Sequence, residues 1–292
     1  ILMNKKEKIL ITGGAGYIGS MLTPYLLKKN YHVTVLDNFM YKQNSLSTNC
    51  INDSFNVIKG DVRDQKLIKN LISKSDIIIP LAAYVGAPLC DRDPVGAKST
   101  NLDAQLFLLN ELSIDQKLLM PITNSGYGIG NKNSLCDENS PLNPVSLYGK
   151  HKVEIENEAL KRENTVSFRL ATVFGMSSRM RLDLLVNDFV YRACNDKFII
   201  LFEGHFRRNF IHILDVVRVF NFGLENFPKM KGSVFNVGLS NANLTKIELC
   251  EEIKKQIPEF FYHEAKIGKD PDKRDYLVSN KKIEQLGFVP TK

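Results

Sequence analysis

The chain has 292 residues, of which 43% are hydrophobic and 24% charged, and its formal net charge is +7. This ordinary globular composition suits one large α/β unit or two closely joined lobes. No apolar run reaches the length of a membrane span, residues 1–8 lack a signal-peptide core, and no basic-aromatic interleaving suggests a nucleic-acid platform.

The five cysteines lie far apart in the sequence and form no CxxC pair. Neither a zinc site nor a disulfide framework is therefore indicated, and we expect reduced cysteines in a cytoplasmic protein without a metal. A doubly charged small ligand, together with ordinary solvated lysines, accounts for the positive balance. We expect neither a nucleic acid nor a membrane as a partner.

A glycine-rich turn follows the first apolar run. Residues 9–11 suit a buried strand, and a helical pattern begins near residue 18. Between them, Gly13 lets the chain turn out of the strand, Gly16 lets a diphosphate approach the backbone, and Gly19 lets the helix pack on the sheet. The segment predicts a dinucleotide site at a helix N-terminus, because strand, glycines and helix occur together.

Asp37 ends the second predicted strand, residues 33–36. A carboxylate at this point accepts hydrogen bonds from both adenosine ribose hydroxyls and repels a 2′-phosphate, so it favours NAD over NADP. The alternative is an ordinary βα turn with no ligand. The spacing from the glycine turn to Asp37 favours the dinucleotide site.

The third predicted strand, residues 55–59, is followed by Asp61 and Val62. Asp61 could accept the adenine amino group, with Val62 supplying a backbone contact. It could instead cap the helix predicted over 65–73, and the two roles do not exclude each other.

The fourth strand, residues 76–80, runs into small residues at 81–83, which leave room for a cofactor. A helix is predicted over 99–112. A fifth strand, 118–123, then delivers residues 123–128 to the same crevice. Strands that alternate with helices predict a parallel sheet covered on both faces.

Tyr148 and Lys152 are four residues apart on a helix predicted from about 148 to 162, so they share one face. A phenol has a reference pKa of about 10, and a nearby ammonium lowers it. Tyr148 could then take a proton from a sugar hydroxyl while hydride leaves the same carbon for a nicotinamide. Such pairs are common on solvated helices, but this one follows a strand that ends in Thr123 and an expected NAD loop.

The character of the sequence changes after residue 175. The elements predicted from residue 166 onward are strands at 166–170, 198–202, 209–213 and 234–237, and helices at 182–194, 214–225, 244–256 and 280–286. We predict an α/β fold, a Rossmann-type doubly wound parallel sheet with a smaller C-terminal substrate-binding lobe. The NAD-binding domain is expected over 1–175, with 209–238 returning to it. The nucleotide-sugar lobe is expected over 176–208 and 239–292.

Together the motifs resemble the extended short-chain dehydrogenase/reductase superfamily, in its NAD-dependent nucleotide-sugar epimerase/dehydratase branch. The matching segments are residues 13–19, 61–64, 81–83, Asn101, Tyr148 with Lys152, and 208–215. The resemblance implies that Thr123, Tyr148 and Lys152 form the catalytic triad. The residues expected to bind NAD are Gly13, Gly16, Tyr17, Ile18, Gly19, Asp37, Asn38, Asp61, Val62, Leu81, Ala82, Ala83, Asn101, Tyr148 and Lys152.

Several positions depart from the family pattern. In the family's 4,6-dehydratases an Asp-Glu pair follows the triad threonine, whereas this chain has Asn124 and Ser125, which do not titrate near neutral pH. Dehydration is therefore disfavoured. The residues expected to bind a nucleoside diphosphate-sugar are Asn124, Ser125, Thr172, Arg179, Arg181, Arg208 and Arg274.

Residues 123–130, 179–189 and 270–280 more narrowly resemble bacterial GDP-heptose C4-dehydrogenases of capsule biosynthesis. This resemblance implies oxidation of a C4 hydroxyl by tightly held NAD. The closest alternative is a 4-epimerase that works through a transient 4-keto sugar. A catalytically silent NAD-binding regulatory protein is disfavoured because Tyr148 and Lys152 are both present. The family also implies a homodimer through helices 99–112 and 148–162.

Overall fold

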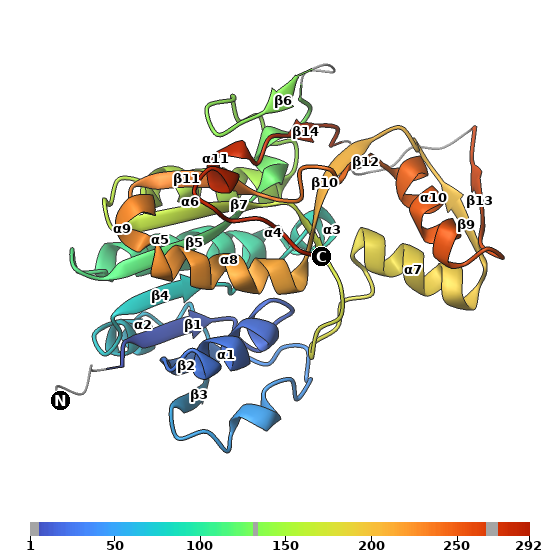
Figure 1. Ribbon diagram of the computed structural model, residues 1–292. Coiled ribbons are helices and arrows are strands. Elements are labelled where there is room, and N and C mark those ends of the chain that lie inside the picture. The colour runs from blue at the N-terminus through green and yellow to red at the C-terminus, as the bar shows by residue number, and fades with distance from the viewer. Residues whose placement is uncertain (1–5, 131–133, 267–273) are drawn as a thin grey trace.

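A parallel sheet forms the centre of the molecule (Figure 1). The computed structural model describes residues 6–130, 134–266 and 274–292. Within these ranges seven strands make one sheet in the order β3-β2-β1-β4-β5-β7-β11, and every neighbouring pair is parallel. The strands are β1 (Lys8–Thr12), β2 (His32–Asp37), β3 (Phe55–Lys59), β4 (Ile77–Pro80), β5 (Lys117–Thr123), β7 (Thr165–Leu170) and β11 (Ser233–Val237).

Helices cover both faces of this sheet. One face packs on α1 (Gly19–Lys28) and α8 (Ile213–Glu225), and the other on α2 (Gln65–Ile72), α5 (Ala104–Glu111) and α6 (Leu147–Ala159). The strand β4 is buried along its whole length, as a strand with helices on both sides must be. The predicted Rossmann-type α/β fold is confirmed. Its strand order reverses between β1 and β4, where such sheets form a crevice at the carboxyl ends of the strands.

A smaller group of elements stands beside this body (Figure 1). It contains α7 (Leu185–Asn195), α10 (Lys246–Gln256) and the parallel pair β9 (Phe198–Leu201) and β13 (Phe261–Glu264). These elements have an apolar core of their own, which includes Phe189, Leu249 and Phe260. A three-stranded sheet of β8 (Thr172–Phe174), β10 (Arg207–His212) and β12 (Asn243–Thr245) contacts α8 of the larger body and α7 and α10 of the smaller group.

The C-terminal segment differs from the expected division. Residues 239–292 were all assigned to the smaller lobe, but α11 (Lys281–Glu284) packs beside β11. Ile283 and Phe288 are 1% and 3% exposed and belong to the core that covers the larger sheet. The burial of these two apolar side chains stabilises the return of the chain to the larger sheet.

The predicted helix 99–112 also differs in detail. It is a π-helical turn, Ser99–Asp103, that leads into α5, and it is preceded by the short helices α3 (Ala87–Arg92) and α4 (Pro94–Lys98). The remaining short elements are η1 (Ser47–Asn49), η3 (Asn124–Tyr127), β6 (Leu135–Cys136), α9 (Phe227–Met230) and β14 (Leu277–Val278).

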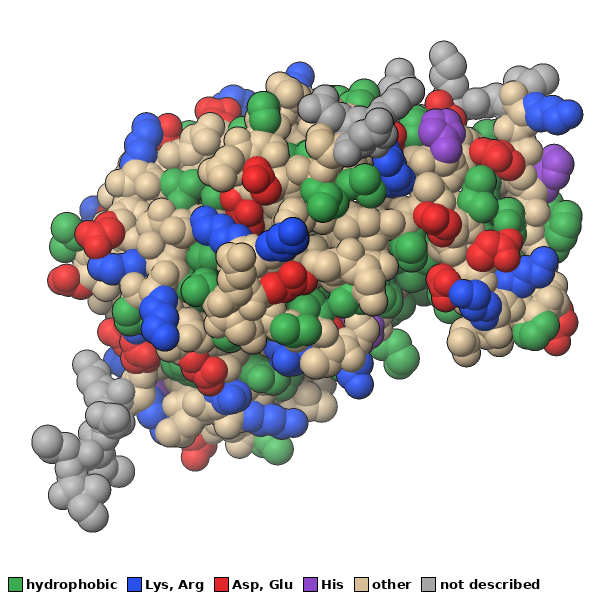
Figure 2. Space-filling view, turned by 45° about the horizontal axis from the view of Figure 1, so that its top comes forward, with side chains coloured by type: hydrophobic (Ala, Val, Ile, Leu, Met, Phe, Trp, Pro, Cys, Tyr) green, Lys and Arg blue, Asp and Glu red, His purple; other side chains and the backbone are tan. Residues whose placement is uncertain are grey.

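Charged side chains of both signs are mixed on the face shown in Figure 2, which has no basic patch that dominates it. Across the described ranges, no helix is both long and apolar enough to cross a membrane.

Candidate active site

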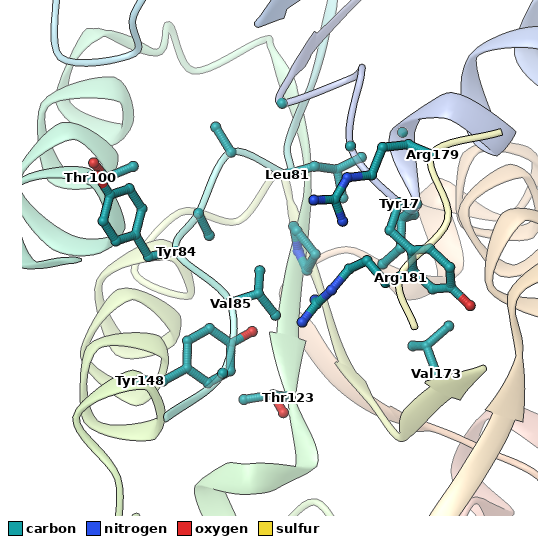
Figure 3. Close-up of a pocket in the computed structure, with 18 of the residues that line it drawn as sticks. Tyr17, Leu81, Tyr84, Val85, Thr100, Thr123, Tyr148, Val173, Arg179 and Arg181 are labelled. Carbon is teal, nitrogen blue, oxygen red and sulfur yellow. The ribbon is translucent and has the colours of Figure 1, made fainter. Parts of the chain in front are cut away.

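One pocket runs along the carboxyl ends of the strands, from the glycine turn to Tyr148 (Figure 3). Its walls come from residues 13–19, 36–43, 60–63, 81–87, 121–125, 146–152, 170–173, 179–184, 274 and 276, although not every residue in these ranges lines it. Segments far apart in the sequence therefore meet at the crevice that the sheet topology predicts.

The glycine turn has the geometry of a diphosphate cradle. Gly13 has a φ of +72°, and a Cβ there would lie 2.5 Å from the backbone nitrogen of Ala82. A Cβ on Gly19 would lie 2.5 Å from the Cα of Gly14, whereas one on Gly16 would approach only the Gly13 oxygen, at 3.1 Å. Gly13 and Gly19 are thus required by packing, and Gly16 leaves the backbone open where a ligand phosphate would approach.

Asp37 is held beside this turn by two backbone hydrogen bonds. Its Oδ2 accepts from the amide of Ala15 at 3.0 Å, and its Oδ1 accepts from the amide of Phe39 at 2.8 Å. Each carboxylate oxygen keeps a further lone pair, so the ribose hydroxyls of an adenosine could still be bound.

Asp61 lies in the pocket wall, but it does not cap a helix. The N-cap of α2 is Asp64, whose carboxylate accepts from the Leu67 amide at 3.0 Å. Asp61 instead pairs with Arg63 at 2.6 Å, and this guanidinium lowers the pKa of the Asp61 carboxyl. The capping alternative is therefore wrong, because the helix begins three residues later than that role requires.

Tyr148 and Lys152 are carried by the first turns of α6. Ser146 caps this helix by accepting from the Gly149 amide at 3.1 Å, which sets Tyr148 beside the pocket. Lys152 is 5% exposed, and its Nζ donates to the Pro121 carbonyl at 3.0 Å. Tyr148 and Lys152 therefore both face the crevice from one helix face.

The charge state of this pair differs from the expectation. Burial raises the pKa of Tyr148 to about 12, although the charges of Arg181 and Arg274 oppose the shift. Burial also lowers the pKa of Lys152 to about 8. The expected lowering of the Tyr148 pKa by Lys152 is not found, because desolvation dominates and the lysine donates to Pro121.

Thr123 takes part in a chain of hydroxyls at the end of β5. Its Oγ1 donates to the Ser125 Oγ at 2.9 Å and accepts from the Ser125 amide at 3.1 Å. The guanidinium of Arg274 also donates to the Ser125 Oγ. Because that oxygen already accepts twice, its own proton is available to a ligand in the pocket.

Three expected ligand residues do not line the pocket: Asn101, Asn124 and Arg208. The Asn101 amide instead accepts from the Tyr84 amide at 2.7 Å and donates to the Tyr84 carbonyl at 2.8 Å, so it holds the wall of the pocket. Asn124 is 1% exposed. Arg208 is 3% exposed, and its guanidinium lies 5.8 Å from the Tyr276 ring centre.

All other predicted site residues line the pocket. Sequence reasoning missed Tyr41, Tyr84, Val85, Thr100 and Tyr276. Tyr41 lies between the second and third predicted strands, at a position for which the sequence predicted no role. Tyr84 and Val85 directly follow the small residues at 81–83, and this position was the one available signal.

A model of the NAD dependent epimerase/dehydratase family matches residues 9–238. The chain belongs to this family. Its NAD-dependent epimerases and dehydratases act on nucleotide sugars, and NAD is the cofactor that the glycine turn and Asp37 fit.

Individual relatives agree with this membership. A dTDP-D-glucose 4,6-dehydratase of Dictyostelium discoideum is 30% identical over 277 residues, or 84% of this chain, and the chain spans 63% of that relative's length. A UDP-glucose 4-epimerase of Lactobacillus helveticus is 25% identical over 314 residues, which cover 97% of this chain and 92% of the relative. Among solved structures, a UDP-glucuronic acid 4-epimerase of Bacillus cereus, in complex with UDP-glucuronic acid and NAD, has a TM-score of 0.85 and 25% identity. The superposition covers 98% of this chain and 94% of the Bacillus cereus chain.

Proposed function

We propose that this family member oxidises the C4 hydroxyl of a nucleoside diphosphate-sugar to a 4-keto sugar. The observation that carries the proposal is one pocket that is lined both by the glycine turn and by Thr123, Tyr148 and Lys152. In Figure 3, Thr123 and Tyr148 lie together, away from Tyr17 of the turn. Such a pocket can hold a sugar alcohol between a proton acceptor and a dinucleotide.

The residues divide the reaction as follows. The glycine turn and Asp37 would hold NAD⁺, which would supply the acceptor for the C4 hydride as the C4–O bond becomes a carbonyl. Tyr148 would first lose its phenolic proton to solvent and would then, as the phenolate, accept the hydroxyl proton. The hydroxyls of Thr123 and Ser125, joined at 2.9 Å, would hydrogen-bond the same substrate oxygen. Arg181 and Arg274 favour the phenolate, since their charges oppose the burial that raises the pKa of Tyr148.

Dehydration fits this site poorly. Elimination of water from a 4-keto sugar needs a further acid and a further base near C5 and C6. The two residues after Thr123 are Asn124, which does not line the pocket, and Ser125, whose hydroxyl is bound to Thr123 and Arg274. Neither side chain titrates near neutral pH.

A GDP-heptose-like substrate, used in bacterial surface polysaccharide biosynthesis, is our preferred assignment. Its support is the resemblance of residues 123–130 and 179–189, since residues 270–273 of the third resembling segment lie outside the described residues. Arg181 and Arg274 line the pocket near Tyr148 and suit the oxygens of a diphosphate. The relatives named above instead act on dTDP- and UDP-sugars.

A 4-epimerase is the second candidate, and its support is the epimerase names of two of these relatives. The same tyrosine would remove and return the proton while hydride returned to the other face of C4. The two reactions share every residue of the pocket, and they differ only in whether the ketone leaves.

The deciding experiment supplies NAD⁺ with UDP-, GDP- and dTDP-hexoses and GDP-heptose, and follows NADH absorbance together with the proton NMR spectrum of the product. We expect stoichiometric NADH and a 4-keto sugar. An inverted C4 hydroxyl without net NADH would establish epimerisation instead. If none of the nucleotide sugars in the panel reacted, the proposal would be refuted.

A further inference from the structure

The segment that follows β8 crosses over the glycine turn. The Tyr17 hydroxyl donates to the Gly175 carbonyl at 2.6 Å, and the Ser177 hydroxyl donates to the Tyr17 carbonyl at 2.7 Å. The Arg179 amide then donates to the Ser20 Oγ at 3.2 Å. These bonds fasten residues 175–179 to the N-terminal turn of α1, where the cofactor diphosphate is expected.

The Arg179 side chain is delivered into the pocket from this segment (Figure 3). It is 9% exposed, and its guanidinium carbon lies 3.7 Å from the centre of the Tyr41 ring. Its Nε is buried without a hydrogen-bond partner among the described residues, and no described carboxylate forms an ion pair with it. A buried cation in this state is costly unless an anion binds to it.

Arg181, two residues later, has a different environment. Its guanidinium donates to the Asp183 carboxylate at 3.1 and 2.5 Å. Figure 3 shows it directed toward Val85 and Tyr148, whereas Arg179 lies near Leu81 at the other end of the pocket. Arg181 therefore has a carboxylate that pairs with it, whereas no described carboxylate pairs with Arg179, although the sequence predicted one role for both.

We propose that Arg179 is a cofactor-binding residue, which clamps the diphosphate of NAD from the side opposite the glycine turn. Its planar fork matches two phosphate oxygens, and stacking on Tyr41 holds that fork in one orientation. The N-terminus of α1 and the guanidinium would then hold the diphosphate between them. This assignment replaces the expected contact of Arg179 with the sugar nucleotide.

Calorimetric titration of the full chain, after its bound nucleotide has been removed, tests the clamp. The probes are NAD⁺, NADP⁺, ADP-ribose, adenosine, UDP and GDP, and the variants are Arg179→Met, Arg179→Lys and the neighbouring Arg181→Met. We expect Arg179→Met to weaken NAD⁺ and ADP-ribose about 10- to 100-fold and adenosine less than threefold, since adenosine has no diphosphate. The affinity of Arg179→Lys for NAD⁺ and ADP-ribose should lie between those of the unmodified chain and Arg179→Met, because lysine keeps the charge but lacks the planar fork.

Arg181→Met should change ADP-ribose affinity less than threefold. If Arg179→Met and Arg179→Lys both left ADP-ribose binding within threefold of the unmodified chain, the clamp would be refuted. Weaker binding of UDP or GDP, with ADP-ribose unaffected, would return Arg179 to the substrate site. A loss confined to NADP⁺ would make it a 2′-phosphate residue and overturn the proposal. Because ADP-ribose lacks nicotinamide, the result does not depend on C4 oxidation.

Discussion

Lys152 is buried and Tyr148 is half-buried, and desolvation favours the neutral form of each side chain. With a pKa of about 12, the phenol stays protonated at neutral pH in the ligand-free chain, while Lys152, with a pKa of about 8, is largely charged. The residue pair is therefore not a preformed base. The positive charges of Arg181 and Arg274 are what the structure supplies to favour the phenolate.

Substitution of Tyr148 by Phe removes only the phenolic oxygen. We expect turnover with the best nucleotide sugar to fall by about 10³-fold, in the range of a lost general base, while NAD⁺ affinity changes less than threefold. Single-turnover NADH formation and NAD⁺ titration measure the two effects. Near-normal turnover in Tyr148→Phe would show that another group accepts the proton.

Lys152→Met should stabilise the protein while abolishing its activity. The folded-state pKa of about 8 lies below the ordinary lysine pKa of 10.5, so below pH 8 the chain carries the full cost of a buried ammonium. That cost is about 1–3 kcal/mol, after allowance for the lost bond to Pro121, and it disappears as pH rises toward 10.5. In urea unfolding at pH 7, Lys152→Met should therefore have a higher free energy of unfolding than the unmodified chain. At pH 10 this difference should be less than half as large. An advantage that did not depend on pH would contradict the burial argument.

At the scale of elements, two glycines of the turn are needed for different reasons, one for packing of the backbone and the other for access of the ligand. Gly19 has no room for a Cβ because the backbone of Gly14 lies 2.5 Å from its position, whereas Gly16 meets a single oxygen at 3.1 Å. The same substitution at these two positions should therefore have two different effects.

We expect Gly19→Ala to lower the free energy of unfolding by about 2–3 kcal/mol, because the contact is with backbone and cannot relax cheaply. Gly16→Ala should cost less than about 1 kcal/mol of stability but weaken NAD⁺ binding at least tenfold, since its methyl group would occupy the phosphate approach. Urea unfolding and NAD⁺ titration on both variants provide the comparison. Equal stability losses would mean that Gly16, too, is a packing glycine.

At the scale of the whole molecule, a buried ion pair joins the helix layer to the sheet. The Glu156 carboxylate of α6 accepts from Arg169 of β7 at 2.7 Å and from the Ser167 hydroxyl at 2.6 Å. Arg169 also donates to the Tyr127 hydroxyl at 3.0 Å, which bonds Asn236 of β11 at 2.7 Å. The network fixes the helix that carries Tyr148 against the strand next to Thr123.

Glu156→Gln should destabilise the chain by about 3 kcal/mol, because it leaves the buried Arg169 charge uncompensated. Glu158→Gln on the same helix is the matched control. Its pair with Lys161 is solvent-exposed, so we expect a loss below about 0.5 kcal/mol. Thermal and urea unfolding at one pH measure both changes. A similar small loss in the two variants would show that the network adds no stability.

Local pattern was sufficient wherever one segment carries both its structure and its role. Short apolar runs, flanked by glycines or by segments with helical periodicity, predicted all seven strands of the large sheet. The glycine turn, Asp37 and the four-residue spacing of Tyr148 and Lys152 are likewise local signals, because each depends on backbone geometry within a few turns of the chain.

Tertiary structure alone decided what depends on distant segments. It separated Arg179 from Arg181, turned Asn101 into a support for Tyr84, and brought Arg274 to Ser125. It also returned Phe288 to the larger core. The physical reason is the same in each case: an arginine, an amide or an apolar ring takes its role from the charge, hydrogen-bond partner or surface that folding brings to it, and no spacing along the chain encodes that partner.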